Sequence, residues 1–376
     1  MKTMIGQIQK NILGSHRLSN KNKVKNLLYY EARKRGAERS WKNRHQKVFE
    51  VNSSYAKSSP RNIEAEHKKI WAPFRDNVNV STLNLCQNIS GIADPRFIPE
   101  DIFVSDIEPT LLIEESVHFL SHKSFYNQWF DEGVFPKDIL HRIDGEYLDQ
   151  NFKRVERKQI QSCLADISYP VVMKPNKDSY GGKNIHFVRS KEELVRLVEN
   201  EDNFVVQEQI SQHDFFSKFN PVGLNTIRVY VYRSVVDHQL HILSTTLRMG
   251  KGGSLDNETD GGIHCLIKPS GHLNGYAVDK FCRKYSKHPD TNYPFEGIIP
   301  NYDGLKELTL KIAGKVFFSH IIGLDICLDT SNQWRVIELN TKGHTIRFSQ
   351  YGGSPFLGKF TSEVIEFCKN NHWSLR

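Results

Sequence analysis

The chain has 376 residues, of which 38% are hydrophobic and 25% are charged, a composition typical of soluble globular proteins with substantial cores. No stretch approaches the roughly 18 uninterrupted apolar residues of a membrane span, and the N-terminus lacks the apolar core of a signal peptide, so we expect a cytoplasmic protein. The net charge of +8 is uneven, because residues 1–60 contain fourteen Lys or Arg residues against three Asp or Glu residues, whereas residues 61–376 are slightly acidic.

Residues 1–60 are predicted to form a basic helical extension. Residues 24–49 have helical character, and their charge and apolar residues leave three interpretations open. The segment contacts an anionic membrane surface, which would place the protein at the inner face of a membrane; it contacts a biosynthetic complex; or it forms a solvated pair of helices. Nucleic acid is not expected as a partner, because no recognisable base-reading module accompanies the charge.

Residues 61–120 are predicted to form a small mixed α/β region. Prolines and aspartates alternate there with short apolar runs, and residues 102–104 (IFV) predict a strand between loops. The following segment, HKSFYNQWFDEGVFP, predicts a helix that ends near Gly133.

Residues 121–205 are predicted to form a central lobe. A strand in YPVVMKP is followed by a glycine-containing loop and a second strand in IHFV. Ser190 and Glu193 have the spacing of a capping box at the start of an amphipathic helix, and NFVVQEQI predicts a further strand.

The loop in this lobe is a candidate phosphate site. Gly181 and Gly182 lack a Cβ atom, so backbone N–H groups can approach phosphate oxygens closely, and Lys174 and Lys183 add positive charge. The alternative is an ordinary glycine turn between two strands.

Residues 206–376 contain most of the remaining predicted strands. TIRVYVYR and HQLHILSTTLRM predict two strands, and the loop GKGGSLDNETDGG after them is a candidate lid. A hairpin in IHCLIKPSGHLNGYAV, a helix in NYDGLKELTLKIAGKVFF, another hairpin and a closing helix follow. Hairpins without regular βαβ alternation predict an α+β fold.

The last predicted hairpin carries the candidate metal ligands. Asp325 in GLDICLD and Glu338 in WRVIELN would face each other across an antiparallel pair, and period-2 geometry puts Asn340 on the same face as Glu338. Such an oxygen-lined pocket suits Mg²⁺, which proteins hold through one or two carboxylates together with substrate phosphates. The alternative is a hairpin with polar residues on its solvated face.

In this order, the features resemble the ATP-grasp superfamily, whose members clamp ATP between two α+β lobes. The similarity runs from about Lys123 to the C-terminus and rests on VVMKP with SYGGKNIHFV, VVQEQI, TIRVYVY and the GLDICLD/WRVIELN hairpin. NTIRVYVYR, LDNETDGGIHCLIKPSGHL and SGIADPRFIPEDIF look most like the sugar-transfer-associated group, which is often found with capsule and exopolysaccharide machinery. The resemblance implies an ATP-grasp fold, with lobes at residues 121–205 and 206–376.

For the nucleotide phosphates, the resemblance implies that Lys174 contacts the α and β phosphates. The loop with Gly181 and Gly182 would close over the β and γ phosphates, with Lys183 beside it. Lys123 matches an earlier phosphate lysine that precedes the central lobe; an exposed helical lysine is the alternative.

For adenosine, the resemblance implies a hinge at Gln207 and Glu208. The backbone of residues 207–210 would meet the adenine edge, and Ile210 would pack on the base. Asp214 would accept hydrogen bonds from the ribose hydroxyls, although an Asp in QHDFF is also a candidate helix cap.

For the metal, the resemblance implies that Asp325, Glu338 and Asn340 hold two Mg²⁺ ions, which Glu338 bridges. A carboxylate that attacks the γ-phosphate brings like charges together, so the site also needs cationic side chains. Alternation in TIRVYVY puts Arg228 on the face that an internal cleft would need, with a surface ion pair as the alternative.

The implied activity is ATP-dependent carboxylate–amine ligation through an acyl phosphate, on a carboxylated sugar, a glycan precursor or an amino acid. Arg248 or Arg347 would stabilise the oxyanion or anchor an acidic acceptor. A phosphotransferase and a nucleotide-binding scaffold are the alternatives. TKGHTIRF after the Glu-x-Asn motif and Gly323 before Asp325 depart from the broader family pattern, which leaves the acceptor open.

Overall fold

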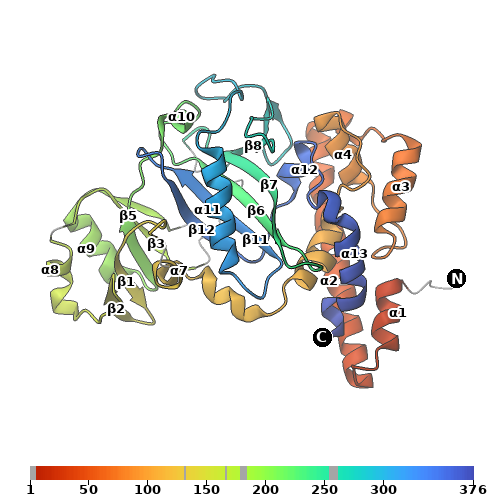
Figure 1. Ribbon diagram of the computed structural model, residues 1–376, viewed down its shortest axis with the longest axis horizontal. Helices are drawn as coiled ribbons and strands as arrows, with labels where there is room; N and C mark the ends of the chain where they lie inside the picture. Colours follow the sequence, from red (N-terminus) through yellow and green to blue (C-terminus); the bar gives the residue numbers. More distant parts are fainter. Residues whose placement is uncertain (1–5, 131–132, 166, 178–183, 254–260) are drawn as a thin grey trace.

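A computed structural model describes residues 6–130, 133–165, 167–177, 184–253 and 261–376 (Figure 1). It contains a five-stranded sheet in the order β2-β1-β5-β3-β4 and a seven-stranded sheet in the order β10-β9-β8-β7-β6-β11-β12, and the paired strands run antiparallel. The expected α+β fold is confirmed. The strands are β1 (Asp138–Ile143), β2 (Glu146–Asp149), β3 (Val171–Pro175), β4 (His186–Val188), β5 (Phe204–Glu208), β6 (Thr226–Arg233), β7 (Leu240–Met249), β8 (Ile263–Ile267), β9 (Ala277–Val278), β10 (Lys284–Tyr285), β11 (Ile321–Leu328) and β12 (Trp334–Asn340).

The small sheet and its helices form the lobe on the left of Figure 1. Helix α9 (Lys191–Asn200) begins at Ser190, whose side chain accepts a hydrogen bond from the backbone N–H of Glu193, as the capping pattern predicts. Leu194 and Val198, one turn apart, are fully buried in a core shared with the strands. Helix α8 (Ile160–Cys163) belongs to the same lobe.

One face of the large sheet is covered by helix α11 (Tyr302–Gly314), which lies across it in Figure 1. Alternate residues of β6, including Ile227 and Val229, are buried in a core with Leu305 and Ile312 of the helix. Arg228 therefore points to the opposite face, together with the other even-numbered residues of β6 that line the cleft described below.

Helices of the first 120 residues pack with the C-terminal helix α13 (Thr361–Asn371) at the far end of the large sheet (Figure 1). The long helix α2 (Asn20–Val51) buries Tyr30 in a core that also contains Tyr232 of β6 and Val364 of α13. The other helices are α1 (Gln7–Gly14), α3 (Arg61–Trp71), α4 (Ser81–Ser90), α5 (Glu100–Ile102), α6 (Glu108–Leu111), α7 (Tyr126–Phe130), α10 (Asp214–Ser217) and α12 (Arg347–Tyr351).

The strand predicted at residues 102–104 is wrong. Pro99 precedes helix α5, acidic Glu100 and Asp101 occupy its first turn, and the chain continues as a π-helical turn over Phe103–Ile107. Acidic residues and a preceding proline favour a helix start, and the apolar run is buried between helices rather than paired in a sheet.

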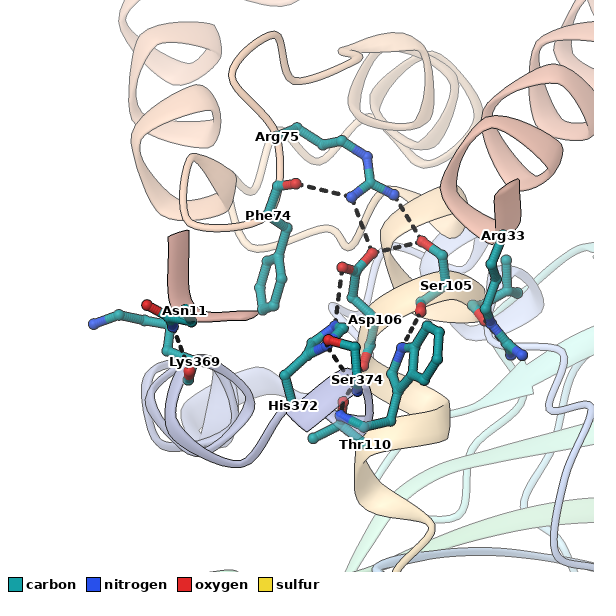
Figure 2. Close-up of polar contacts among 12 residues, drawn as sticks. Asn11, Arg33, Phe74, Arg75, Ser105, Asp106, Thr110, Lys369, His372 and Ser374 are labelled. Atoms are coloured by element: carbon teal, nitrogen blue, oxygen red, sulfur yellow. Dashed lines mark hydrogen bonds and ion pairs between the residues drawn. The ribbon is translucent and has the colours of Figure 1, made fainter. Parts of the chain in front are cut away.

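A buried polar network joins the helical region to the C-terminus (Figure 2). Arg75 donates to Asp106 at 2.9 Å and to Ser105 at 2.7 Å, and a ring nitrogen of His372 lies 3.3 Å from the other Asp106 oxygen. Trp373 donates to the Ser105 carbonyl at 2.8 Å. Because these groups are buried and paired, the first 120 residues are fixed against the end of the chain.

Candidate functional site

A cleft of about 1480 Å³ lies between the two sheets. Its walls come from β3, the segment 207–212 and the polar face of the large sheet. Lys174 closes one side, and Asp325, Glu338 and Asn340 lie on the floor. The cleft therefore brings together residues from both predicted lobes. Gly181, Gly182 and Lys183, which the sequence assigns to the phosphate loop, lie outside the described residues.

The predicted pairing of the two carboxylates is confirmed. Asp325 of β11 and Glu338 of β12 are direct cross-strand partners, and the register shifts just beyond them, between Asp325 and Ile326. Asn340, two residues after Glu338, also lines the cleft. Local alternation and a short turn set this geometry, so the sequence alone was enough to predict the pairing of Asp325 with Glu338.

Two arginines hold Asp325. Arg228 Nε lies 2.5 Å from one carboxylate oxygen and Arg228 Nη2 lies 2.7 Å from the other, while Arg248 Nη1 lies 2.7 Å from the first. Burial alone would raise the pKa of Asp325, but the two guanidinium groups outweigh it and hold the pKa well below its usual range. The carboxylate is thus ionised and oriented, and a cation bound there would share it with both arginines.

Gly323, which precedes Asp325 by two residues, packs closely against a tyrosine of the neighbouring strand. It is the cross-strand partner of Tyr230, and a Cβ atom at this position would approach the tyrosine ring to 3.0 Å. The Tyr230 hydroxyl in turn accepts hydrogen bonds from Arg228 at 3.2 Å and from the backbone N–H of Thr345 at 2.9 Å. A packed tyrosine therefore occupies the space that a longer side chain at residue 323 would need.

Two buried lysines face the carboxylates from the other side of the cleft. Lys123 Nζ lies 2.8 Å from a Glu338 oxygen, and both lysine side chains are almost fully buried. Burial, followed by the charge of Lys123, lowers the pKa of Lys174 to about 8. The site has more positive than negative groups, since its floor and wall combine Lys123, Lys174, Arg228 and Arg248 with Asp325 and Glu338.

The side chains of the two predicted hinge residues, Gln207 and Glu208, form hydrogen bonds with neighbouring protein residues. Gln207 donates to Asp138 at 2.7 Å, and Glu208 accepts from Arg335 at 2.5 Å and from the backbone of Lys137 at 3.0 Å. These contacts fix the strand end next to the cleft, which Ile210 also lines.

Asp214 and Arg347 lie away from the cleft lining. Asp214 is exposed in the first turn of α10, where the cap is the preceding His213. Arg347 is buried in α12, with its guanidinium 5.5 Å from the Trp41 ring and 4.9 Å from the Phe348 ring. The ribose and acceptor roles of these two residues stay predictions without support from their positions.

Sequence reasoning missed several polar residues that line the cleft, among them His264 and Arg33. His264 sits within the apolar strand IHCLI, where period-2 alternation was the only signal that it faces the same side as Arg248. Arg33 comes from the basic N-terminal helix and reaches the cleft from there, where it donates to the Val104 carbonyl at 2.8 Å. No local sequence pattern predicts that Arg33 reaches the cleft.

The chemistry of the site suits an anionic ligand together with a divalent cation such as Mg²⁺. The surplus of cationic groups requires anions, and the Nδ2 of Asn340 is buried without a hydrogen-bond partner in the described part of the chain. Its amide oxygen, with the oxygens of Asp325 and Glu338, forms an all-oxygen donor set of the kind that Mg²⁺ prefers. Groups of three or more His, Cys, Asp or Glu side chains that could hold a metal are absent from the described ranges, so such an ion would need the amide and substrate oxygens.

Residues 191–362 match the model of a family described as sugar-transfer associated ATP-grasp. The match contains the arginines and the carboxylate hairpin, and it begins after Lys174. No curated protein matches the sequence significantly.

Several solved structures share a distant similarity. N5-carboxyaminoimidazole synthetase from Staphylococcus aureus, complexed with ADP, is 13% identical, with coverage of 65% of this chain and 52% of that chain and a TM-score of 0.40. The biotin carboxylase domain of 2-oxoglutarate carboxylase from Hydrogenobacter thermophilus is 13% identical, with coverage of 63% of this chain and 45% of that chain and a TM-score of 0.38. The ATP-grasp ligase PsnB complexed with minimal precursor is 14% identical, with coverage of 68% of this chain and 64% of that chain and a TM-score of 0.39. The chain thus spans less than two thirds of each, and likeness this distant carries no inference about its chemistry.

Proposed function

Residues 191–362 belong to the sugar-transfer associated ATP-grasp family, and from this premise we propose that the protein is an ATP- and Mg²⁺-dependent carboxylate–amine ligase. Its acid is a carboxylated sugar or glycan precursor in surface polysaccharide biosynthesis, and its nucleotide product is ADP. The observation that carries the proposal is the row of charged side chains across the cleft, from Lys174 and Lys123 through Glu338 and Asp325 to Arg228 and Arg248.

This row suits a reaction in which negative groups must meet. A substrate carboxylate oxygen attacks the γ-phosphorus, the bond to the bridging oxygen breaks, and ADP leaves. Lys123 and Lys174 offset the phosphate charge from one side, and Arg228 and Arg248 attract the incoming acid from the other. When bound, Mg²⁺ would neutralise phosphate charge, with Asp325, Glu338 and Asn340 as its protein ligands.

The second step joins the amine. Its nitrogen attacks the acyl carbon and loses a proton, a tetrahedral oxyanion forms, and inorganic phosphate leaves as the oxyanion collapses to the amide. In this proposal Arg248 stabilises that oxyanion, and its buried position beside Asp325 on the cleft floor supports the role. Burial strengthens the attraction, since water screens it less.

The proposal includes a contact between the basic helix α2 and an anionic membrane surface at the cytoplasmic face. Lys21, Lys25, Arg39 and Lys42 are exposed at spacings that place them along one stripe of the helix, with exposed Leu28 in the same stripe. The described part of the chain has no helix with the length and apolar character needed to cross a bilayer, so any such contact is peripheral.

Product analysis tests the proposal. Incubation with ATP, Mg²⁺, candidate uronic acids and amines should release equal amounts of ADP and phosphate only when acid and amine are both present. Glu338→Gln should lower turnover at least a hundredfold, because it removes a proposed metal ligand and the partner of Lys123. Formation of AMP and pyrophosphate would contradict the ligase assignment, and a stable phosphorylated product without an amine requirement would indicate a phosphotransferase.

A further inference from the structure

In the described ranges, His264 and His45 are the buried histidines with neither ring nitrogen hydrogen-bonded, but His45 Nε2 lies 3.6 Å from a Glu100 oxygen, whereas His264 has no ion pair with a carboxylate. Its side chain is only 4% exposed, yet neither ring nitrogen has a hydrogen-bond partner there. The other buried histidines have a hydrogen bond or a nearby carboxylate: His45, His67, His141, His288, His344 and His372. An imidazole buried without partners costs free energy, so a ligand that supplies them is expected.

The position of His264 points to the acceptor end of the cleft. It is the cross-strand partner of Arg248, and Arg248 is in turn the partner of Thr226, so the three side chains share one face of the sheet. All three line the cleft. Strand order places β8 three strands beyond β11, on the side away from Glu338 and the lysines.

The ring of His264 is held in a fixed orientation. It stacks on Phe348 of α12, with ring centroids 3.6 Å apart and planes inclined by 14°. Phe348 also lines the cleft. A stacked ring cannot easily rotate, so a ligand must match the directions of its nitrogens.

The surroundings of His264 select against positive charge. Burial, and then Arg248, Arg347 and Arg228, lower the pKa of His264 well below its ordinary value, which keeps the imidazole neutral. A neutral imidazole has one donor nitrogen and one acceptor nitrogen, and a hydroxyl group can partner either of them, so a ligand with several hydroxyls can satisfy both. A second carboxylate offers only acceptors, and an ammonium group offers only donors and is repelled by the arginines.

We propose that His264 is a specificity-determining residue of the acceptor site, where its ring nitrogens hydrogen-bond separate hydroxyl groups of an acid whose carboxylate is attracted by Arg248. The site then takes a hydroxylated acid of the sugar-acid class and rejects α-amino acids. This inference rests on the proposed function, because the ligase reaction is what requires a carboxylate at this end of the cleft.

Binding of small acids to the full chain tests the proposal. Calorimetric titrations in ADP and Mg²⁺ would use three uronates (glucuronate, galacturonate and mannuronate), with cyclohexanecarboxylate as the acid without hydroxyls and glutamate as the α-amino acid. His264→Phe keeps a ring against Phe348 and removes both nitrogens, whereas His264→Gln keeps a donor and an acceptor. The matched control is His272→Phe, an exposed histidine after the same strand.

At least one uronate should bind the native chain more tightly than glutamate. His264→Phe should weaken that binding at least tenfold and leave cyclohexanecarboxylate unchanged, His264→Gln should recover part of the loss, and His272→Phe should have no effect. Failure of all three uronates to bind, or equal binding by native chain and His264→Phe, would overturn the inference.

Binding of a fluorescent ADP analogue to the same variants separates this failure from that of the proposed function. Normal analogue binding, together with equal uronate binding by the native chain and His264→Phe, overturns the role of His264 alone. If the native chain does not bind the analogue, the proposed function falls and the inference falls with it.

Discussion

At the scale of single residues, we expect Lys174 to make the proposed nucleotide binding dependent on pH. Its pKa is lowered to about 8 by burial and by Lys123, whereas a bound phosphate favours the charged ammonium and raises the pKa. Binding therefore takes up a proton above pH 8, and the dissociation constant of an ADP analogue should rise with pH, by up to about tenfold per unit.

Fluorescence titrations between pH 7 and 9.5 would measure this dependence. Lys174→Met should bind more weakly at pH 7 and lose the dependence, while Lys177→Met, at an exposed lysine nearby, should keep it. The same pH dependence in Lys174→Met would show that another group is responsible.

Asp325 pairs with two arginines, a structural role that is separate from its proposed part in metal binding. Asp325→Asn would leave Arg228 and Arg248 buried without their carboxylate, which should lower the free energy of unfolding by about 3–5 kcal/mol. Urea denaturation measures the loss. Asp303→Asn is the control, because that exposed carboxylate pairs with Lys306 on the surface and should change stability by less than about 0.5 kcal/mol. A loss below about 1 kcal/mol for Asp325→Asn would mean that the arginines do not depend on it.

At the scale of secondary structure, the sequence predicted what local rules determine. Alternation and a short turn were enough to put Asp325 opposite Glu338, and the Ser190 cap was readable from its spacing. The pairing of Arg228 with Asp325 was not predictable, because it depends on β6 lying beside β11, far along the chain. The contact between Lys123 and Glu338 crosses the cleft and has no local signal either.

The proposed contact between helix α2 and an anionic membrane surface gives the main prediction at this scale. One side of the helix is buried in the cores around Tyr30 and Val48, so the proposed membrane contact must be tested in the full chain. Full-length protein should bind vesicles with 30% anionic lipid at low salt and dissociate at high salt. Replacement by Gln of Lys21, Lys25, Arg39 and Lys42 should abolish sedimentation with the vesicles.

The control for α2 removes the same number of charges elsewhere. Lys153, Arg154, Arg157 and Lys158 are exposed on the small lobe, and their replacement by Gln should leave vesicle binding nearly unchanged. Equal losses in both variants would mean that net charge, and not the helix, is responsible.

At the scale of the whole molecule, the cleft exists because two sheets meet across it. The lysines come from the side of the small sheet, whereas the carboxylates and arginines come from the large one. Under the proposed function, the lysines offset phosphate charge on one side of the γ-phosphate and the arginines attract an acid on the other. The central claim of the proposed function is therefore that an acid and ATP react directly with each other.

Transfer of ¹⁸O tests that claim most directly. The enzyme would be supplied with ATP, Mg²⁺, an amine and uronates labelled with ¹⁸O in their carboxylates. An acyl phosphate requires that one carboxylate oxygen leaves with the phosphoryl group, so mass spectrometry should find one ¹⁸O in each inorganic phosphate released. Phosphate released during amide formation without the label would contradict the account.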